Sequence, residues 1–124
     1  MSAKKTNFSQ IENQRLRAYS RAYINGQVFI HNDNHLYIAP LNNISAGGLF
    51  VDKLCTLAEG SPVRVVVKSS KFPTPIQAKG NIVRVQKAGK SGLAVEFTSI
   101  NQKAREVIQA VVFQNKLETA MRIA

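Results

Sequence analysis

The feature of this chain that most constrains its fold is a series of short segments in which every second residue is apolar. The first begins near Tyr23 and places Ile24, Gly26, Val28 and Ile30 on one face, as a half-buried β-strand requires. Further extended segments lie at residues 36–40, 48–52, 63–68, 76–87 and 93–98, separated by runs of turn-forming residues. Six short strands joined by tight turns predict a small antiparallel β-barrel.

The longest of these segments changes its alternation part-way along. Ile76, Ala78 and Ile82 share one face, and the apolar positions then switch to Val83 and Val85. We predict a β-bulge or a sharp coil in this strand, because closing a barrel requires such corners.

Apolar residues near the C-terminus return to helical spacing. The stripe contains Ala104, Val107, Ile108, Val111, Val112, Asn115 and Leu117. Ser99 followed by Gln102 predicts a capping box at the start of this helix. We therefore expect an all-β fold, a six-stranded antiparallel β-barrel, with a C-terminal helix packed on it. Ala110, Phe113 and Met121 lie partly off the stripe, and we interpret them as part of a broad core-facing surface in preference to a second apolar face for a partner.

The N-terminal segment carries no strand pattern. Residues 1–8 are small, polar or basic up to Phe8, and Ser9 followed by Glu12 fits a capping box for a short helix. We expect a flexible tail over residues 1–13 and a single domain over residues 14–124 that includes the C-terminal helix.

Length and charge narrow the classes of function. A chain of 124 residues fits one domain, and a hydrophobic content of 44% is sufficient for a packed core. Lys and Arg number 17 against 7 for Asp and Glu, so the formal net charge is +10. This surplus predicts a partner or ligand that carries negative charge.

Few residues support metal or catalytic chemistry. Cys55 cannot form an internal disulfide, and with His31 and His35 it falls short of the four ligands of a structural zinc site. No nucleophile can be placed beside these histidines, and the acids form no close pair, so we expect no enzyme activity. No apolar run approaches the ~20 residues of a membrane span, and the N-terminus lacks a signal-peptide core, so we expect a cytoplasmic protein.

A group of arginines near the start of the ordered chain is a candidate anion site. Arg17 and Arg21 are four residues apart, Arg15 precedes them, and no acid lies between Arg15 and Arg21. On a helix the pair would share a face and repel each other unless an anion lay between them. The arginine fork binds phosphate, the O6 and N7 edge of guanine, and flat rings. The alternative is an ordinary solvated basic face.

A second candidate element is the segment 43–48, which precedes the strand predicted at 48–52. Asn43 and Ser45 are two residues apart, so in an extended segment both project outward while Ile44 points inward. An amide and a hydroxyl suit the edge of a base or a phosphate oxygen. Gly48 permits a positive φ and a close approach of a ligand to the backbone. The alternative is an Asx turn that enters a strand.

Taken together, these two elements resemble the PilZ domain, the bacterial receptor module for cyclic di-GMP. The order is Arg-x-x-x-Arg at 17–21, one hairpin, and Asn-x-Ser-x-x-Gly at 43–48. The segments 80–85 and 92–97 are similar to the closing strands of the same family. The resemblance covers roughly residues 14 to 115.

The resemblance implies roles for individual residues. Arg17 and Arg21 are expected to contact the phosphates and guanines, Asn43 and Ser45 a guanine, and Gly48 to shape the turn, with additional candidates at Arg15, Leu16 and Gly47. Leu16 departs from the family pattern, because members often have a further arginine there that favours an intercalated ligand dimer. The number of bound molecules is therefore open, and we lean towards one.

The resemblance further implies that the ligand orders the arginine segment and that the signal passes to a partner protein. We expect a monomer or a weak homodimer. The alternative function is a small β-barrel that binds single-stranded nucleic acid through its net charge and through Tyr19, Tyr23, Phe29, Tyr37 and Phe50. A PilZ-like adaptor that has lost ligand binding is a third reading, and the intact Arg, Asn, Ser and Gly positions count against it.

Overall fold

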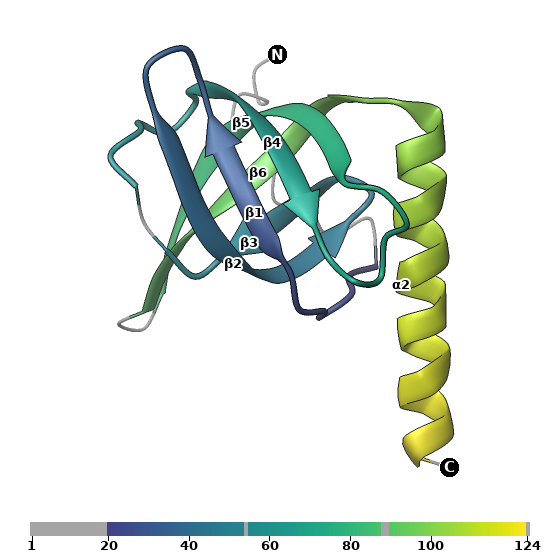
Figure 1. The fold of residues 1–124 in the computed structure, drawn as a ribbon. Helices are drawn as coiled ribbons and strands as arrows, with labels where there is room; N and C mark the ends of the chain where they lie inside the picture. The colour runs from purple at the N-terminus through teal and green to yellow at the C-terminus, as the bar shows by residue number, and fades with distance from the viewer. Residues whose placement is uncertain (1–19, 54, 88–89, 124) are drawn as a thin grey trace, which may run out of the picture.

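The computed structural model describes residues 20–53, 55–87 and 90–123 and contains a closed antiparallel β-barrel with one helix beside it (Figure 1). The strands are β1 (Gln27–His31), β2 (Leu36–Ser45), β3 (Gly48–Val51), β4 (Pro62–Lys68), β5 (Ile76–Lys87) and β6 (Lys90–Ile100), and the helix is α2 (Gln102–Ile123). The strand order around the barrel is β1-β2-β3-β6-β5-β4. The predicted fold class is confirmed. The predicted tail and the boundary after residue 13 lie outside the described residues.

The barrel interior is filled by the alternate residues of each strand. In β1, Val28 and Ile30 are buried, and in β4 the valines at 63, 65 and 67 are buried, while the residues between them face outward. Several predicted boundaries were wrong, and β6 runs from Lys90 to Ile100 instead of over residues 93–98. β1 begins at Gln27 instead of Tyr23, and β2 continues beyond Pro40 to Ser45, because Leu41 to Ser45 pair with β3.

β5 contains the predicted irregularity, at a different place. The register with β6 shifts between Lys79 and Gly80, before the predicted switch. A Cβ at residue 80 would collide with the carbonyl oxygen of Glu96, so only glycine allows the strands to approach this closely. Beyond the bulge, Ile82 belongs to the main core, whereas Val83 packs on the outer face with Ala94.

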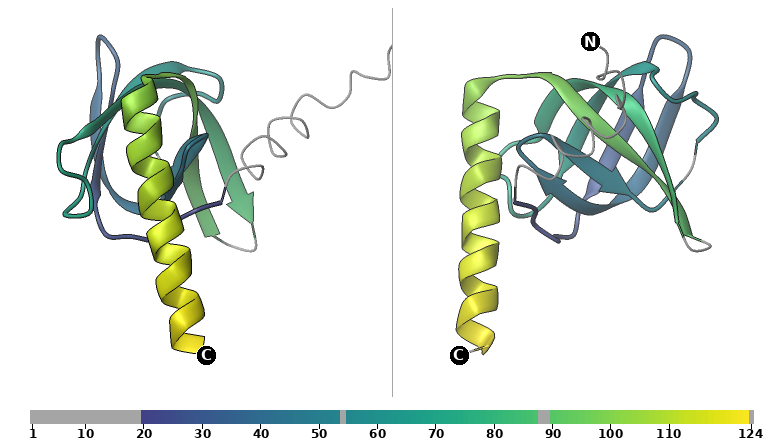
Figure 2. Two further views of the ribbon diagram at one scale, coloured as in Figure 1. Left: turned by 90° about the vertical axis from the view of Figure 1, so that its right-hand side faces the viewer. Right: turned by 180° about the vertical axis from the view of Figure 1, so that it is seen from behind.

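α2 lies beside the barrel, and its C-terminal half extends beyond it (Figures 1 and 2). Ile108 and Val112 belong to the barrel core. The capping prediction was wrong: Asn101 Oδ1 accepts the backbone N–H of Ala104 at 2.9 Å, whereas Ser99 is paired within β6.

The prediction of a broad core-facing helix surface was also wrong. Phe113, Leu117 and Met121 are 66%, 42% and 64% exposed. They are four residues apart in sequence and therefore lie on one helix face. In the described part of the chain, no helix has the length and hydropathy needed to span a membrane.

Candidate functional site

The end of the arginine segment is attached to β2 by a single backbone bridge. The N–H of Ala22 donates to the Ile44 carbonyl at 2.9 Å, and the N–H of Ile44 donates to the Ala22 carbonyl at 3.0 Å. Both side chains are fully buried in the core. The bridge therefore fixes Ala22, the residue after Arg21, opposite Ile44, which lies between Asn43 and Ser45 in β2.

The bridge determines which side chains share the outer face. Residues flanking an antiparallel pair lie opposite one another in reverse order, so Arg21 is on the Ser45 side and Tyr23 on the Asn43 side. Arg21 is half-buried. The structure thus brings Arg21 together with Asn43 and Ser45. Arg15, Leu16 and Arg17 lie outside the described residues.

Asn43 is positioned by a chain of side-chain hydrogen bonds. Its Nδ2 donates to Asn42 Oδ1 at 2.8 Å, and Asn42 Nδ2 donates to both Asp52 carboxylate oxygens at 3.1 and 2.9 Å. Asn42 is the extra residue of a bulge in β2, which turns it towards Asp52. Asn43 is 6% exposed, and its Oδ1 makes no hydrogen bond with another described residue. This oxygen is a fixed acceptor.

Ser45 and the two glycines form the turn between β2 and β3. Ser45 Oγ accepts the N–H of Gly47 at 3.2 Å and donates to the Gly48 carbonyl at 3.4 Å. Asn43 and Ser45 project from the outer face of the barrel, as expected. Both residues are nevertheless buried. Gly48 does not adopt the positive φ that a glycine permits: among the described glycines only Gly60 has one, at +87°. Gly48 is instead the first residue of β3, paired with Ser45 and Glu96.

The sequence did not single out Glu96 as a site residue. Glu96 is 4% exposed and lies directly opposite Gly48 on one side and Asn81 on the other. Ser45, Gly48, Glu96 and Asn81 therefore form one row across the outer face. The residues opposite Glu96 follow from the strand register, so no sequence signal marks it.

A second missed contact joins the site to α2. Lys116 Nζ donates to Ser20 Oγ at 3.1 Å, next to Arg21 in the chain. A hollow of about 250 Å³ lies between these elements, lined by Ser20, Ala46, Gln109, Val112, Phe113 and Lys116. This contact joins two residues that are 96 positions apart in sequence. The hollow also includes Phe113, so it connects the candidate site with the exposed apolar face of α2.

The metal candidates are not brought together. In residues 20–53, 55–87 and 90–123, no three His, Cys, Asp or Glu side chains form a group that would hold a metal ion. His35 stacks on Tyr37 with ring centroids 6.0 Å apart, whereas His31 lies at the end of β1. Cys55 is half-buried and packs against the core, as a small apolar side chain does.

The closed six-stranded antiparallel barrel with a C-terminal helix defines a class of small β-barrel domain. Residues 15–114 match the family described as PilZ domain. The chain belongs to the PilZ domain family, as its motifs predicted.

Solved structures with the same fold include two from well-known bacteria. The inhibitor of motility MotI/DgrA of Bacillus subtilis has a TM-score of 0.64 at 20% identity, over 81% of this chain and 50% of that chain. YcgR of Escherichia coli in complex with c-di-GMP has a TM-score of 0.69 at 16% identity, over 85% of this chain and 48% of that chain. This protein therefore spans about half the length of each.

An isolated domain gives a similar match over nearly its whole length. The PilZ domain of Escherichia coli YcgR with c-di-GMP has a TM-score of 0.60 at 15% identity, over 85% of this chain and 95% of that chain. Comparison with curated protein sequences gives no match.

Proposed function

We propose that this protein is a receptor for cyclic di-GMP and passes the signal to a partner protein. The observation that carries the proposal is the Ala22–Ile44 bridge, which holds Arg21 beside Asn43 and Ser45. Family membership and the c-di-GMP complexes of YcgR with the same fold support it.

The chemistry of the grouped side chains matches the two parts of the ligand. Arg17 and Arg21 supply guanidinium forks for the phosphates and for the O6 and N7 edge of guanine. Asn43 Oδ1 accepts from the guanine N–H groups, because the Asn42–Asp52 chain aims it. Ser45 exchanges its long bond to the Gly48 carbonyl for a ligand oxygen. Arg15, Leu16 and Gly47 border these residues in sequence.

In this proposal the ligand acts by ordering the segment that ends at Ala22. Without a dianion, the arginines repel one another, and folding onto the barrel is unfavourable. With it, their charge is neutralised and the segment closes over Asn43 and Ser45. Moving a closed fraction from 1% to 99% needs roughly a 10⁴-fold preference of the ligand for the closed state.

The closed segment creates the surface that signals. Ser20 accepts a hydrogen bond from Lys116 on α2, so ordering of the segment would change the contacts of the helix. We expect the protein to act as an adaptor, as a monomer or a weak homodimer, with no enzymatic step of its own.

Isothermal titration calorimetry with cyclic di-GMP tests the receptor function and reports the stoichiometry. We expect saturable binding in the micromolar range or tighter, with one molecule per chain. Folded protein that gives no heat at micromolar concentrations would refute the proposal. Two molecules per chain would leave the receptor function intact and show that Leu16 does not prevent an intercalated ligand dimer.

A further inference from the structure

The strand β4 carries none of the residues proposed to bind cyclic di-GMP. Asn43 and Ser45 lie on β2, which is two strands from β4 around the closed order. The outer face of β1, β4 and β5 is therefore separate from Arg21, Asn43 and Ser45, and the proposed ligand does not use it.

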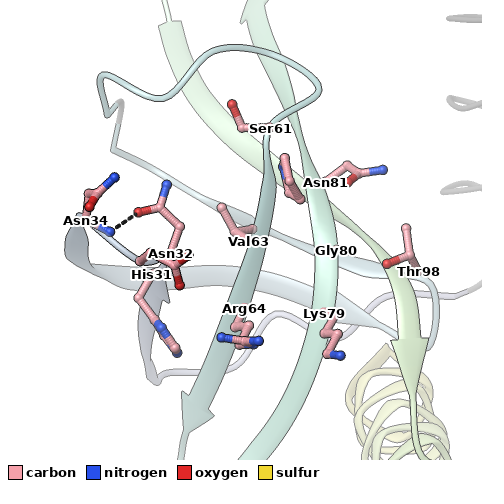
Figure 3. A pocket seen from close by; sticks show the side chains of 12 residues that line it. His31, Asn32, Asn34, Ser61, Val63, Arg64, Lys79, Gly80, Asn81 and Thr98 are labelled. Atoms are coloured by element: carbon pink, nitrogen blue, oxygen red, sulfur yellow. Dashed lines mark hydrogen bonds between the residues drawn. The ribbon is translucent and has the colours of Figure 1, made fainter.

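Two cations, Arg64 and Lys79, lie in register with the histidine His31 on this face. His31 lies directly opposite Arg64, and Arg64 directly opposite Lys79, so the three side chains form one row across β1, β4 and β5. Figure 3 shows them next to one another at one side of a pocket of about 490 Å³, which is also lined by Asn32, Ser61, Asn81 and Thr98. Arg64 and Lys79 are exposed.

An apolar row follows two residues further along β1 and β4 and continues onto β2, whereas β5 places Gln77 opposite Val66. Phe29 lies opposite Ile38 on β2 and opposite Val66 on β4. Ile38 is 40% exposed, and Phe29 and Val66 are half-buried. A third row begins two residues on with Lys68, whose Nζ lies 5.8 Å from the Phe29 ring centroid. Along β4 the outward side chains thus read cation, apolar, cation.

The charges of Arg64 and Lys79 are not paired with an acid within these three rows. We call this surface the basic face, and it is formed by His31, Arg64, Lys79, Phe29, Ile38, Val66 and Lys68. Like charges directly opposite each other destabilise a sheet. Arg64 and Lys79 make no hydrogen bond or ion pair with another described residue. Asp33 lines the same pocket as Arg64 and Lys79 and is the one described acid there, and the other described acids lie outside the three rows. The arrangement favours an external anion.

We propose that the basic face is the docking site for an extended acidic segment of the partner protein, with the pattern acidic-x-apolar-x-acidic. This rests on the proposed adaptor function and names the chemistry of its partner. Alternate residues of an extended chain repeat every ~6.6–6.8 Å, which is also the spacing of the rows along β4. A peptide lying along β4 therefore places its two carboxylates on Arg64 and Lys68 and its apolar side chain on Val66. A nucleic-acid backbone offers no apolar side chain for the middle row.

The test uses the full chain and synthetic peptides, with binding followed by NMR chemical shifts of backbone amides. The probe is a 12-residue peptide that repeats Glu-Ser-Leu-Ser, and the matched peptides replace Leu by Ser or Glu by Lys. We expect the first peptide to shift residues of β1, β4 and β5 and to bind at least about tenfold more tightly than either matched peptide. Equal binding of the Leu and Ser peptides would overturn the proposal, because the apolar row would have no role.

Charge reversal by Arg64→Glu together with Lys79→Glu distinguishes binding at the basic face from non-specific attraction by the net charge of the protein. We expect this variant to bind the acidic peptide at least about tenfold more weakly. The matched control is Lys71→Glu with Arg122→Glu, which changes the net charge equally at exposed positions outside the basic face. We expect the control to change peptide affinity by less than about twofold. Equal loss in both variants would show non-specific attraction and overturn the site. Tighter binding of oligo-dT or of phosphatidylserine vesicles at this face, at physiological salt, would overturn a protein partner.

Cyclic di-GMP titrations of the same variants separate this proposal from the receptor function. Arg64→Glu with Lys79→Glu is expected to bind cyclic di-GMP with unchanged affinity, because both residues lie on strands that carry neither Asn43 nor Ser45. Retained cyclic di-GMP binding also shows that the variant is folded. Failure of peptide binding with intact nucleotide binding would reject the docking site alone.

Discussion

Arg21 has a different environment from the other described arginines, because the next residue is anchored to β2 by two backbone hydrogen bonds. An arginine on an anchored backbone loses less conformational entropy on binding than one on a free segment. Asn43 is fixed in a similar way by Asn42 and Asp52. Pre-organisation of these two residues is the physical basis for a small site on an open barrel face.

We predict that Arg21→Ala weakens cyclic di-GMP binding by about 1.5–3 kcal/mol, since it removes a charge-assisted hydrogen bond to a phosphate or guanine. The measurement is calorimetric titration of both proteins under identical conditions. Arg64→Ala is the matched control, because it removes the same side chain from β4, a strand that carries none of the proposed ligand-binding residues. Wild-type affinity in Arg21→Ala would show that the arginine assignment is wrong.

The helix α2 divides into a part that stabilises the barrel and a part that does not. Ile108 is fully buried in the barrel core, whereas Phe113, slightly more than one turn later, is 66% exposed. Capping by Asn101 begins the helix directly after β6, so its first turns are held against the barrel end. Its later turns extend away from the barrel (Figure 2).

We predict that Ile108→Ala lowers the free energy of unfolding by about 2–5 kcal/mol, because it opens a cavity in the core. Phe113→Ala, a larger truncation on the same helix, should change it by no more than about 0.5 kcal/mol. Urea unfolding followed by circular dichroism measures both. A comparable loss in the two variants would mean that the stripe of Phe113, Leu117 and Met121 packs against the domain in solution.

The whole molecule carries a formal charge of +10, and its described surface has cations on both sides of the barrel. Such a surplus attracts any polyanion, so affinity alone does not distinguish a nucleotide receptor from a nucleic-acid-binding barrel. The two functions differ in how many phosphates are engaged at once.

We predict a shallow salt dependence for cyclic di-GMP. With two phosphates, the slope of log K against log salt should be no steeper than about −1.5, whereas an oligonucleotide that makes six to ten phosphate contacts would show roughly −4 to −7. Titrations with cyclic di-GMP and with oligo-dT between low and physiological salt measure both slopes. Tight, steeply salt-dependent binding of oligo-dT in the absence of cyclic di-GMP binding would favour the nucleic-acid alternative.

Local sequence patterns were sufficient for the strands, the C-terminal helix and the family, because alternation and helical spacing are properties of neighbouring residues. They were not sufficient for the ends of those elements. Ser99 fits a capping box, but it pairs with Lys79 of β5 and is therefore part of strand β6. Asn101 caps the helix instead. Asn43 and Ser45 were expected to be accessible, and both are buried.

The amino-acid sequence by itself determined the class of fold and the pair of motifs that mark the family. The tertiary structure alone decided which distant residues meet: Ala22 with Ile44, Ser20 with Lys116, Gly48 with Glu96, and Arg64 with His31 and Lys79. The reason is that strand order and register in a closed barrel depend on how all six inner faces pack together, and no short segment carries that information.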